Sequence, residues 1–212
     1  MRRLTSADRY FICGGLVLAL FLVFGAARPA QELTTPLSDE TFWRLVTESS
    51  EPGGSFVADN FVSNELSFQH VLPALTEGRK PGGAYLGVGP DQNFTYIIAL
   101  KPKIAFVVDI RRQNMVEHLL FKALIEVSTS RADFLSRLFS RPGPADIDKT
   151  ANVSALFGAF HEIAPTRETY EDTLSTVTGR LVKDHHFELT AEDSKTIEYL
   201  LNAFYYSGPD LT

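Results

Sequence analysis

Residues 85–114 decide the fold and read YLGVGPDQNFTYIIALKPKIAFVVDIRRQN. A first apolar segment ends in Gly87-Val88-Gly89, a helix-like segment follows, and a second apolar segment ends in Asp109. This order is typical of a nucleotide-binding βαβ unit. In such a unit the glycines allow a sharp turn, and an acidic residue about 20 positions later accepts ribose hydroxyls. The stretch therefore predicts two parallel strands with a ligand site where both strands end.

The strands are predicted at Ala84–Val88 and Ile104–Asp109, and the crossover helix at Gln92–Leu100, before Pro102. The second strand is a continuous apolar run, as expected of a parallel strand that is covered on both faces. Outside this unit, apolar spacing and capping residues predict only helices, at 38–49, 64–78, 116–127, 131–140, 151–163, 168–186 and 191–206.

No strand signal follows Asp109, and two parallel strands alone make a marginal sheet with unpaired edges. Three explanations are open: Ser55–Ala58 adds a strand, a partner completes the sheet, or the chain ends before its remaining strands. We favour the last, because Gly208–Thr212 has the residues of a helix-to-strand turn. The expected fold class is α/β, a Rossmann-like and incomplete parallel sheet with a helical part at 130–206 and an N-terminal hydrophobic helix.

The N-terminal segment predicts export or membrane anchoring. Phe11–Ala27 contains no charged residue and follows Arg2, Arg3 and Arg9. Its length lies between the roughly 7–15 residues of a signal-peptide core and the ~20 of a bilayer-spanning helix, so a cleaved signal and an anchor both stay open. Either one divides the chain into residues 1–30 and a domain at 31–212, and the positive-inside rule puts that domain on the extracytoplasmic side.

Composition narrows the function classes. The chain has a net charge of −6, and the first thirty residues contribute four arginines against one aspartate, so the remainder carries −9. An acidic domain is a poor nucleic-acid binder, and we expect no nucleic-acid partner. The single cysteine, Cys13, precedes the domain. The domain itself therefore contains no cysteine, which excludes cysteine chemistry within it. Neither a metal-binding histidine spacing nor a Gly-x-Ser-x-Gly elbow occurs, so we expect no metal and no serine hydrolase.

Gly87–Asn93 together with Asp109–Arg112 resembles the first two motifs of class I S-adenosylmethionine-dependent methyltransferases. The resemblance implies a Rossmann-like fold, S-adenosylmethionine as cofactor, a glycine turn at Gly87 and Gly89, and ribose binding by Asp109. Two positions depart from the family pattern, since Tyr85 replaces an acidic residue and Asp91 a common third glycine. A wider region, about 58–212, is similar to uncharacterised bacterial proteins described as methyltransferase-like, which implies no catalytic residue.

The candidate cofactor-binding residues are Gly87, Gly89, Asp91, Asn93, Asp109 and Arg111. Arg111 and its neighbour Arg112 follow the second strand, where a guanidinium can hold a phosphate or carboxylate, or instead pair with Asp109 or Asp91. The segments 59–60 and 63–65 can join the site from the preceding chain. The catalytic residue is unknown.

Location argues against methyl transfer, because S-adenosylmethionine is a cytosolic cofactor and the N-terminal segment predicts export. The leading hypothesis is a membrane-tethered or exported methyltransferase-like protein with a pocket for S-adenosylmethionine or a nucleotide-type small molecule. The alternative is a non-catalytic binding or scaffold module at the membrane. A nicotinamide or flavin oxidoreductase is weaker, since Gln92 replaces the third Rossmann glycine.

Overall fold

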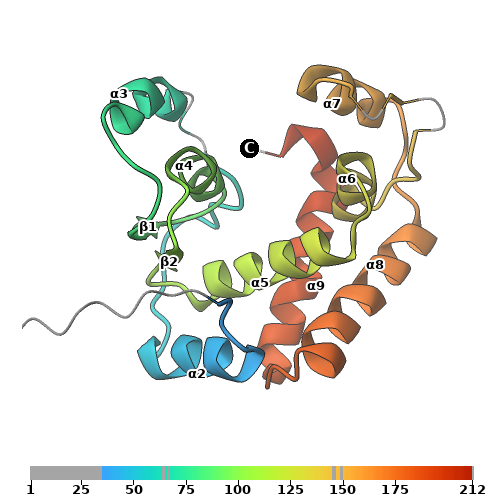
Figure 1. Ribbon diagram of the computed structural model, residues 1–212. Coiled ribbons are helices and arrows are strands. Elements are labelled where there is room, and N and C mark those ends of the chain that lie inside the picture. Colours follow the sequence, from blue (N-terminus) through green and yellow to red (C-terminus); the bar gives the residue numbers. More distant parts are fainter. Residues whose placement is uncertain (1–34, 64, 66, 145–146, 149, 212) are drawn as a thin grey trace, which may run out of the picture. The chain divides into compact units, whose positions relative to one another are not determined.

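The computed structural model describes residues 35–63, 65, 67–144, 147–148 and 150–211 (Figure 1). The compact unit that we describe is Leu37–Thr212. Its strands are β1 (Ala84–Val88) and β2 (Ile104–Val108), and its helices are α2 (Asp39–Ser49), α3 (Leu72–Thr76), α4 (Gln92–Leu100), α5 (Arg112–Val127), α6 (Arg131–Phe139), α7 (Val153–His161), α8 (Arg167–Gly179) and α9 (Ala191–Ser207). Three shorter helical segments are η1 (Phe68–Val71), η2 (Arg180–Asp184) and η3 (Gly208–Asp210).

The predicted Rossmann-like, methyltransferase-like parallel sheet is wrong. The described residues are mostly helical, and their one sheet is the parallel pair β1–β2, in which Ala84 lies opposite Ile104 and Val88 opposite Val108. Ser55–Ala58, one of the sources considered for a third strand, forms no strand. The βαβ unit itself is confirmed, since α4 connects the two strands.

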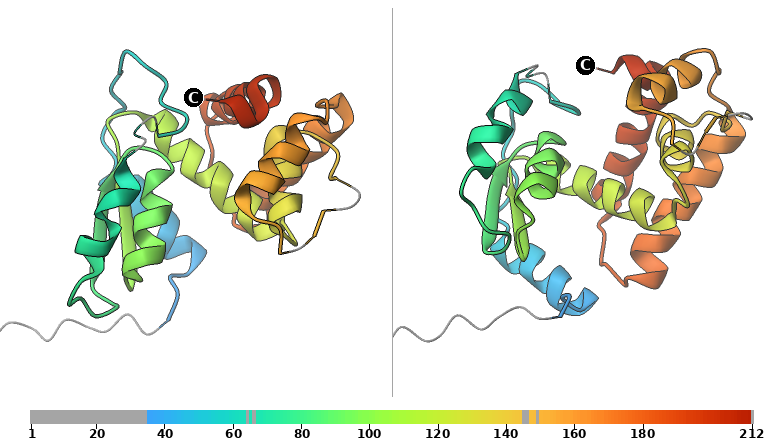
Figure 2. Two further views of the ribbon diagram at one scale, coloured as in Figure 1. Left: turned by 90° about the horizontal axis from the view of Figure 1, so that it is seen from above. Right: turned by 45° about the horizontal axis from the view of Figure 1, so that its top comes forward.

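The hydrophobic core explains why so small a sheet is sufficient. Among the described residues, every buried hydrophobic side chain lies between Val116 and Phe204, on α5 to α9 and their connections. Helices α5, α6, α8 and α9 pack against one another, and α5 leads from the sheet into this helical core in each view (Figures 1 and 2). Helix–helix packing therefore supplies the apolar burial that a larger sheet would otherwise provide.

The helices of the core follow directly from sequence. On α9 the apolar residues Ile197, Leu200, Leu201 and Phe204 recur at helical spacing, and all four are buried. Thr190 caps this helix, because its hydroxyl accepts a hydrogen bond from the backbone N–H at position 193 and the carboxylate there accepts one from the backbone N–H of Thr190.

Within the part of the chain that the structure describes, the sheet is covered on one face only. Helix α4 lies against β1, where the rings of Tyr85 and Tyr96 are 6.4 Å apart between centroids. Leu86 and Phe106, which are register partners on the opposite face, are exposed. The expectation that β2 is covered on both faces is therefore wrong, since the remaining helices pack with one another instead.

No helix in the described part of the chain has both the length and the hydropathy needed to cross a bilayer. The predicted signal or anchor, Phe11–Ala27, and the predicted N-terminal hydrophobic helix lie outside the described residues.

Candidate functional site

The glycine turn after β1 is held from within by Asn93. Its side-chain amide donates hydrogen bonds to the backbone oxygens of Val88, Gly89 and Pro90, at 3.1, 3.0 and 2.7 Å. Its carbonyl oxygen accepts a hydrogen bond from the Tyr85 hydroxyl at 2.8 Å. Asn93 is 1% exposed, so these bonds form inside the molecule. The predicted candidate Asn93 thus fixes the shape of the turn.

Both glycines are required by geometry. A Cβ at Gly87 would collide with the side chains of Asn93 and Tyr85. Gly89 has a φ of +83°, which side chains disfavour, and its N–H donates to the Val108 oxygen at 3.3 Å. This last bond ties the turn after β1 to the end of β2, so the two strand ends lie together as the sequence predicts.

Asp109 at the end of β2 is paired with Arg111. One oxygen of Asp109 accepts hydrogen bonds from the backbone N–H and Nε of Arg111, at 2.8 and 2.9 Å, and the other accepts from Nη2 at 2.8 Å. These bonds from Arg111 hold the pKa of Asp109 below its ordinary value. A carboxylate has about four acceptor sites, so roughly one remains for a ligand hydroxyl.

The same arginine holds the chain that precedes the βαβ unit. Arg111 Nη1 donates to the carbonyl oxygens of Ala58, at 3.3 Å, and Asp59. The ring of Phe56 lies 5.9 Å from the guanidinium carbon, and the Tyr199 hydroxyl on α9 donates to the Asp59 carboxylate at 2.8 Å. Residues 56–63 and 65 are thus fastened across the ends of both strands, and we name them the strap.

Asp91 provides a second fastening point for the strap. Its Oδ1 accepts a hydrogen bond from the backbone N–H of Ser63 at 2.6 Å. This contact lies at the start of α4, where the positive end of the helix dipole also stabilises a carboxylate. Asp91 therefore joins strap and turn.

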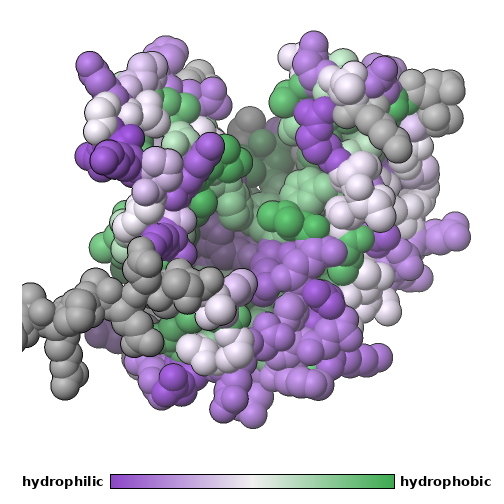
Figure 3. All heavy atoms as spheres, in the orientation of Figure 1, coloured by the Kyte–Doolittle hydropathy of each residue, from purple (hydrophilic) through white to green (hydrophobic). Residues whose placement is uncertain are grey.

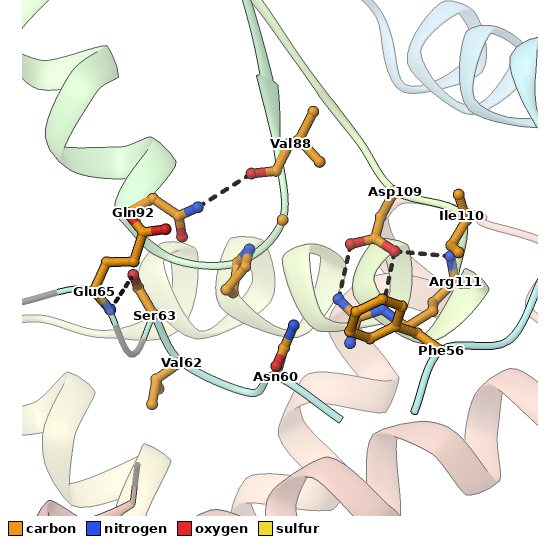
Figure 4. A pocket seen from close by; sticks show the side chains of 12 residues that line it. Phe56, Asn60, Val62, Ser63, Glu65, Val88, Gln92, Asp109, Ile110 and Arg111 are labelled. Atoms are coloured by element: carbon orange, nitrogen blue, oxygen red, sulfur yellow. Dashed lines mark hydrogen bonds and ion pairs between the residues drawn. The ribbon is translucent and has the colours of Figure 1, made fainter. Parts of the chain in front are cut away.

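A pocket of about 360 Å³ lies between the strap and the strand ends (Figure 4). Of the predicted cofactor-binding residues, Gly89, Asp109 and Arg111 line it. Gly87, Asp91 and Asn93 do not line it and instead support the turn and the strap. The remaining lining residues are Phe56, Asn60, Val62, Ser63, Glu65, Val88, Pro90, Gln92 and Ile110.

The pocket combines apolar walls with convergent polar groups, as small-molecule sites do. Its volume lies in the range of roughly 300–1,000 Å³ that is typical of such sites. The oxygen of the Gln92 side chain finds no hydrogen-bond donor among the described residues, although its amide nitrogen donates to Val88 at 3.2 Å. A donor group on a ligand would satisfy that oxygen. Asn60, Ser63 and Glu65 fall in segments that the sequence had already connected with the site, whereas Phe56 and Val62 had not been identified.

A buried polar layer beneath the turn had also not been identified. Glu117 on α5 is 1% exposed, and one of its oxygens has no hydrogen-bond partner in the described chain. Burial, together with the charge of Asp91, raises the pKa of Glu117 to about 9, so this carboxyl is neutral at pH 7. Beside it, His118 Nε2 lies 3.1 Å from the Gly89 oxygen, and burial lowers the pKa of His118. The signal was the polar pair Glu117-His118, which interrupts the apolar residues between Val116 and Leu119 on this helix.

These groups suit the binding of a neutral or hydroxyl-bearing ligand. The acceptors are Asp109, Glu65 and Gln92, the cation is Arg111, and Phe56 provides an aromatic face. Where the structure describes the chain, histidine, cysteine and acidic side chains form no group of three that could hold a metal.

Fold and site together define a helical domain that carries one βαβ unit and a pocket at its strand ends. Residues 60–206 match a family described as a domain of unknown function, DUF7790, and the chain belongs to that family. The matched region includes β1, β2, the pocket residues from Asn60 onward and most of the helical core. No match was found among curated proteins or among solved structures.

Proposed function

We propose that this domain binds a small nucleoside-type ligand in the pocket between the strap and the strand ends. The observation that supports this most is the position of Gly89 and Asp109 in one pocket, where a tight backbone turn faces a carboxylate. In parallel βα units, ligands bind beyond the carboxyl ends of the strands, and a carboxylate at that position accepts ribose hydroxyls.

The first ligand to test is S-adenosylmethionine. The resemblance of the Gly87–Asn93 and Asp109–Arg112 segments to methyltransferase motifs supports this choice, and the aromatic ring of Phe56 gives an adenine ring a partner for stacking. Binding and turnover are separate proposals. If methyl transfer occurs, it rests on holding the donor and acceptor in line, because no side chain in the pocket is assigned a proton-transfer role.

A non-catalytic binding module is the alternative, and one observation favours it. Arg111 already uses three of the roughly four acceptor sites of Asp109. A ribose therefore has to share the carboxylate with Arg111 or displace it. In a binding module of this kind the Asp109–Arg111 pair holds the strap in place, and the ligand forms hydrogen bonds with Gln92 and Asn60 instead.

Isothermal titration calorimetry of the full chain in detergent tests the proposal. The probes are S-adenosylmethionine, S-adenosylhomocysteine, ATP and NAD. We expect micromolar binding of at least one probe, weakened roughly 10- to 100-fold by Asp109→Asn, because a hydrogen bond to a charged group is lost. Absence of heat with every probe would contradict a nucleoside-type ligand.

Asp193→Asn is the matched control for Asp109→Asn. Asp193 makes a similar two-pronged pair with Arg112, at 2.7 and 2.8 Å, and lines no part of the pocket. Its replacement lowers stability without changing ligand affinity. Equal losses of affinity in the two variants would show that general destabilisation, and not the pocket carboxylate, causes the effect.

A further inference from the structure

We infer that the open face of the β1–β2 sheet docks on an anionic lipid bilayer. The face is formed by the register partners Leu86 with Phe106 and Val88 with Val108, because paired residues of parallel strands point to the same side. These four side chains are 72%, 43%, 66% and 48% exposed. We call them the open sheet face.

The open sheet face differs from ordinary scattered surface residues. Single exposed apolar side chains are normal in soluble proteins, but adjacent ones on a sheet form a contiguous patch that marks an interaction surface. Ile110, the residue that follows β2 by two positions, is 61% exposed and extends the apolar region. Helix α4 covers the opposite face, so the described helices do not shield this one.

Basic residues gather at the amino ends of the same two strands. Arg79 and Lys80 precede β1, Lys101 and Lys103 precede β2, and all four are exposed. Backbone hydrogen bonds join the two loops, from Gly82 N–H to the oxygen of Lys101 and from the N–H of Lys103 to Gly83, both at 2.9 Å. The four cations therefore occupy one end of the sheet.

The charge of this part of the chain differs from that of the whole domain. Between positions 67 and 103 the chain has four lysines and arginines and only two acidic residues, Glu77 and Asp91, and Asp91 lies at the other end of the strands. The domain as a whole is acidic. In Figure 3, apolar residues (green) and strongly hydrophilic ones (purple) lie side by side in the part that contains α3, α4 and the sheet.

An apolar patch next to lysines and arginines fits a membrane surface. Leucine, valine and phenylalanine insert at the boundary between headgroups and acyl chains, while the cations bind anionic headgroups. A second copy of the chain is the competing occupant. Charge complementarity favours the bilayer, because the four exposed cations at the amino ends of the strands match anionic headgroups. The docking proposal does not depend on the ligand in the pocket.

The test uses full-length protein reconstituted into vesicles and a fluorescent label that reports its own surroundings. In a Cys13→Ser background, Phe106→Cys carries a polarity-sensitive dye, and Glu168→Cys on α8 is the matched control. Glu168 is exposed, and α8 lies on the other side of α5 from the sheet in Figures 1 and 2. The vesicles contain phosphatidylcholine and phosphatidylglycerol with brominated acyl chains as quenchers.

We expect quenching and a blue shift of the label at position 106, and neither at position 168. Quenching falls several-fold in vesicles of phosphatidylcholine alone and in the Arg79→Gln, Lys80→Gln double variant, because each cation near an anionic surface strengthens binding. The pocket is untouched by these changes, so ligand titration of the same variants stays normal and separates this proposal from the proposed function.

Two results would overturn the docking proposal. The first is equal quenching at positions 106 and 168. The second is a blue shift at 106 that exists without vesicles and disappears on dilution, which would show that a second copy covers the open sheet face.

Discussion

Gly87 is the residue at which the site tolerates least change. Its hydrogen atoms face the side chains of Asn93 and Tyr85, which together hold the turn. We expect Gly87→Ala to lower the free energy of unfolding by about 1–3 kcal/mol, because the added methyl group overpacks a site that has no space for it. Urea denaturation followed by circular dichroism measures the change.

Gly158→Ala on α7 is the control for that substitution. Gly158 is helical, and apart from its chain neighbours and the backbone of its own helix no atom lies within 4 Å of a Cβ built there. Alanine there should raise the free energy of unfolding by up to ~1 kcal/mol, since glycine is the poorer helix former. Similar effects of the two substitutions would refute the close approach at Gly87.

Glu117 makes stability dependent on pH. The pKa of a glutamate is ordinarily 4.5, and that of Glu117 is raised to about 9, first by burial. Between these values the unfolded chain releases a proton that the folded chain keeps. The free energy of unfolding therefore falls as pH rises from about 4.5 towards 9, and the contribution is fully present only below the unfolded pKa.

Glu117→Gln should remove this dependence, because glutamine keeps the shape and carries no ionisable proton. We expect the variant to gain on the order of 1–4 kcal/mol in free energy of unfolding near pH 8 and little near pH 4.5. Denaturation of both proteins across this pH range decides the matter. Parallel stability curves would mean that Glu117 is ionised in the folded chain.

Single residues differed in how far the sequence could identify them. Gly89 and Asp109 were predicted as neighbours from motif spacing, and the structure brings both to the pocket. Asn93 belonged to the same motif, yet its contacts with the turn depend on a side-chain direction that spacing does not give. Glu117 was missed because helical periodicity placed its neighbours in the core and gave no reason to expect a buried carboxyl there.

At the scale of elements, local signals were sufficient for most helices. Capping residues and apolar spacing predicted helices at 38–49, 131–140 and 191–206, and the structure has α2, α6 and α9 within one residue of those limits. The predicted helix at 64–78 is broken into η1 and α3, with Pro73 in the first turn of α3, where proline is tolerated.

The capping box of α9 gives a testable energy. Thr190→Ala removes the hydroxyl that accepts from the Asp193 N–H at 3.1 Å, and we expect it to lower the free energy of unfolding by about 1 kcal/mol. Thermal or urea denaturation measures the loss.

Thr196→Ala in the middle of α9 is the matched control. The Thr196 hydroxyl donates to the Glu192 oxygen, a bond within the helix that contributes little to helix stability, so this change should be neutral or slightly stabilising. A larger loss at position 196 than at position 190 would contradict the capping assignment.

For the whole molecule, the fold class was the point at which sequence reasoning failed. The βαβ segment was correct, and it was extended to a Rossmann-like sheet because a two-stranded sheet cannot bury enough apolar surface alone. The helices after Asp109 were predicted, but that reasoning did not consider that their apolar faces are sufficient for a core of their own. Periodicity identifies apolar faces but does not say which faces pack together.

The membrane topology of the chain is predicted separately, from the arginines and the apolar segment within residues 2–27. A reporter that is active only in the cytosol, fused after Thr212, should be inactive, because the positive-inside rule puts the domain on the other side of the membrane. Activity of that fusion would reverse the predicted location and remove the objection to S-adenosylmethionine as a ligand. Substituting Arg2, Arg3 and Arg9 by glutamine is the control, since it weakens the orientation signal.

The division between helical core and sheet predicts unequal effects of one substitution at two positions. Leu200 on α9 is fully buried, and Leu200→Ala should lower the free energy of unfolding by about 2–5 kcal/mol, because it leaves a cavity in the helical core. Leu86 on the open sheet face is mostly exposed, and Leu86→Ala should change it by no more than ~0.5 kcal/mol. Urea denaturation compares the two variants directly. Amide hydrogen exchange adds local detail: β1 and β2, with little apolar cover on one side, should exchange faster than α5 and α9. If Leu86→Ala lowered the free energy of unfolding of dilute, detergent-free protein as much as Leu200→Ala does, the open sheet face would be covered in solution. The helices would then not be the sole source of the core.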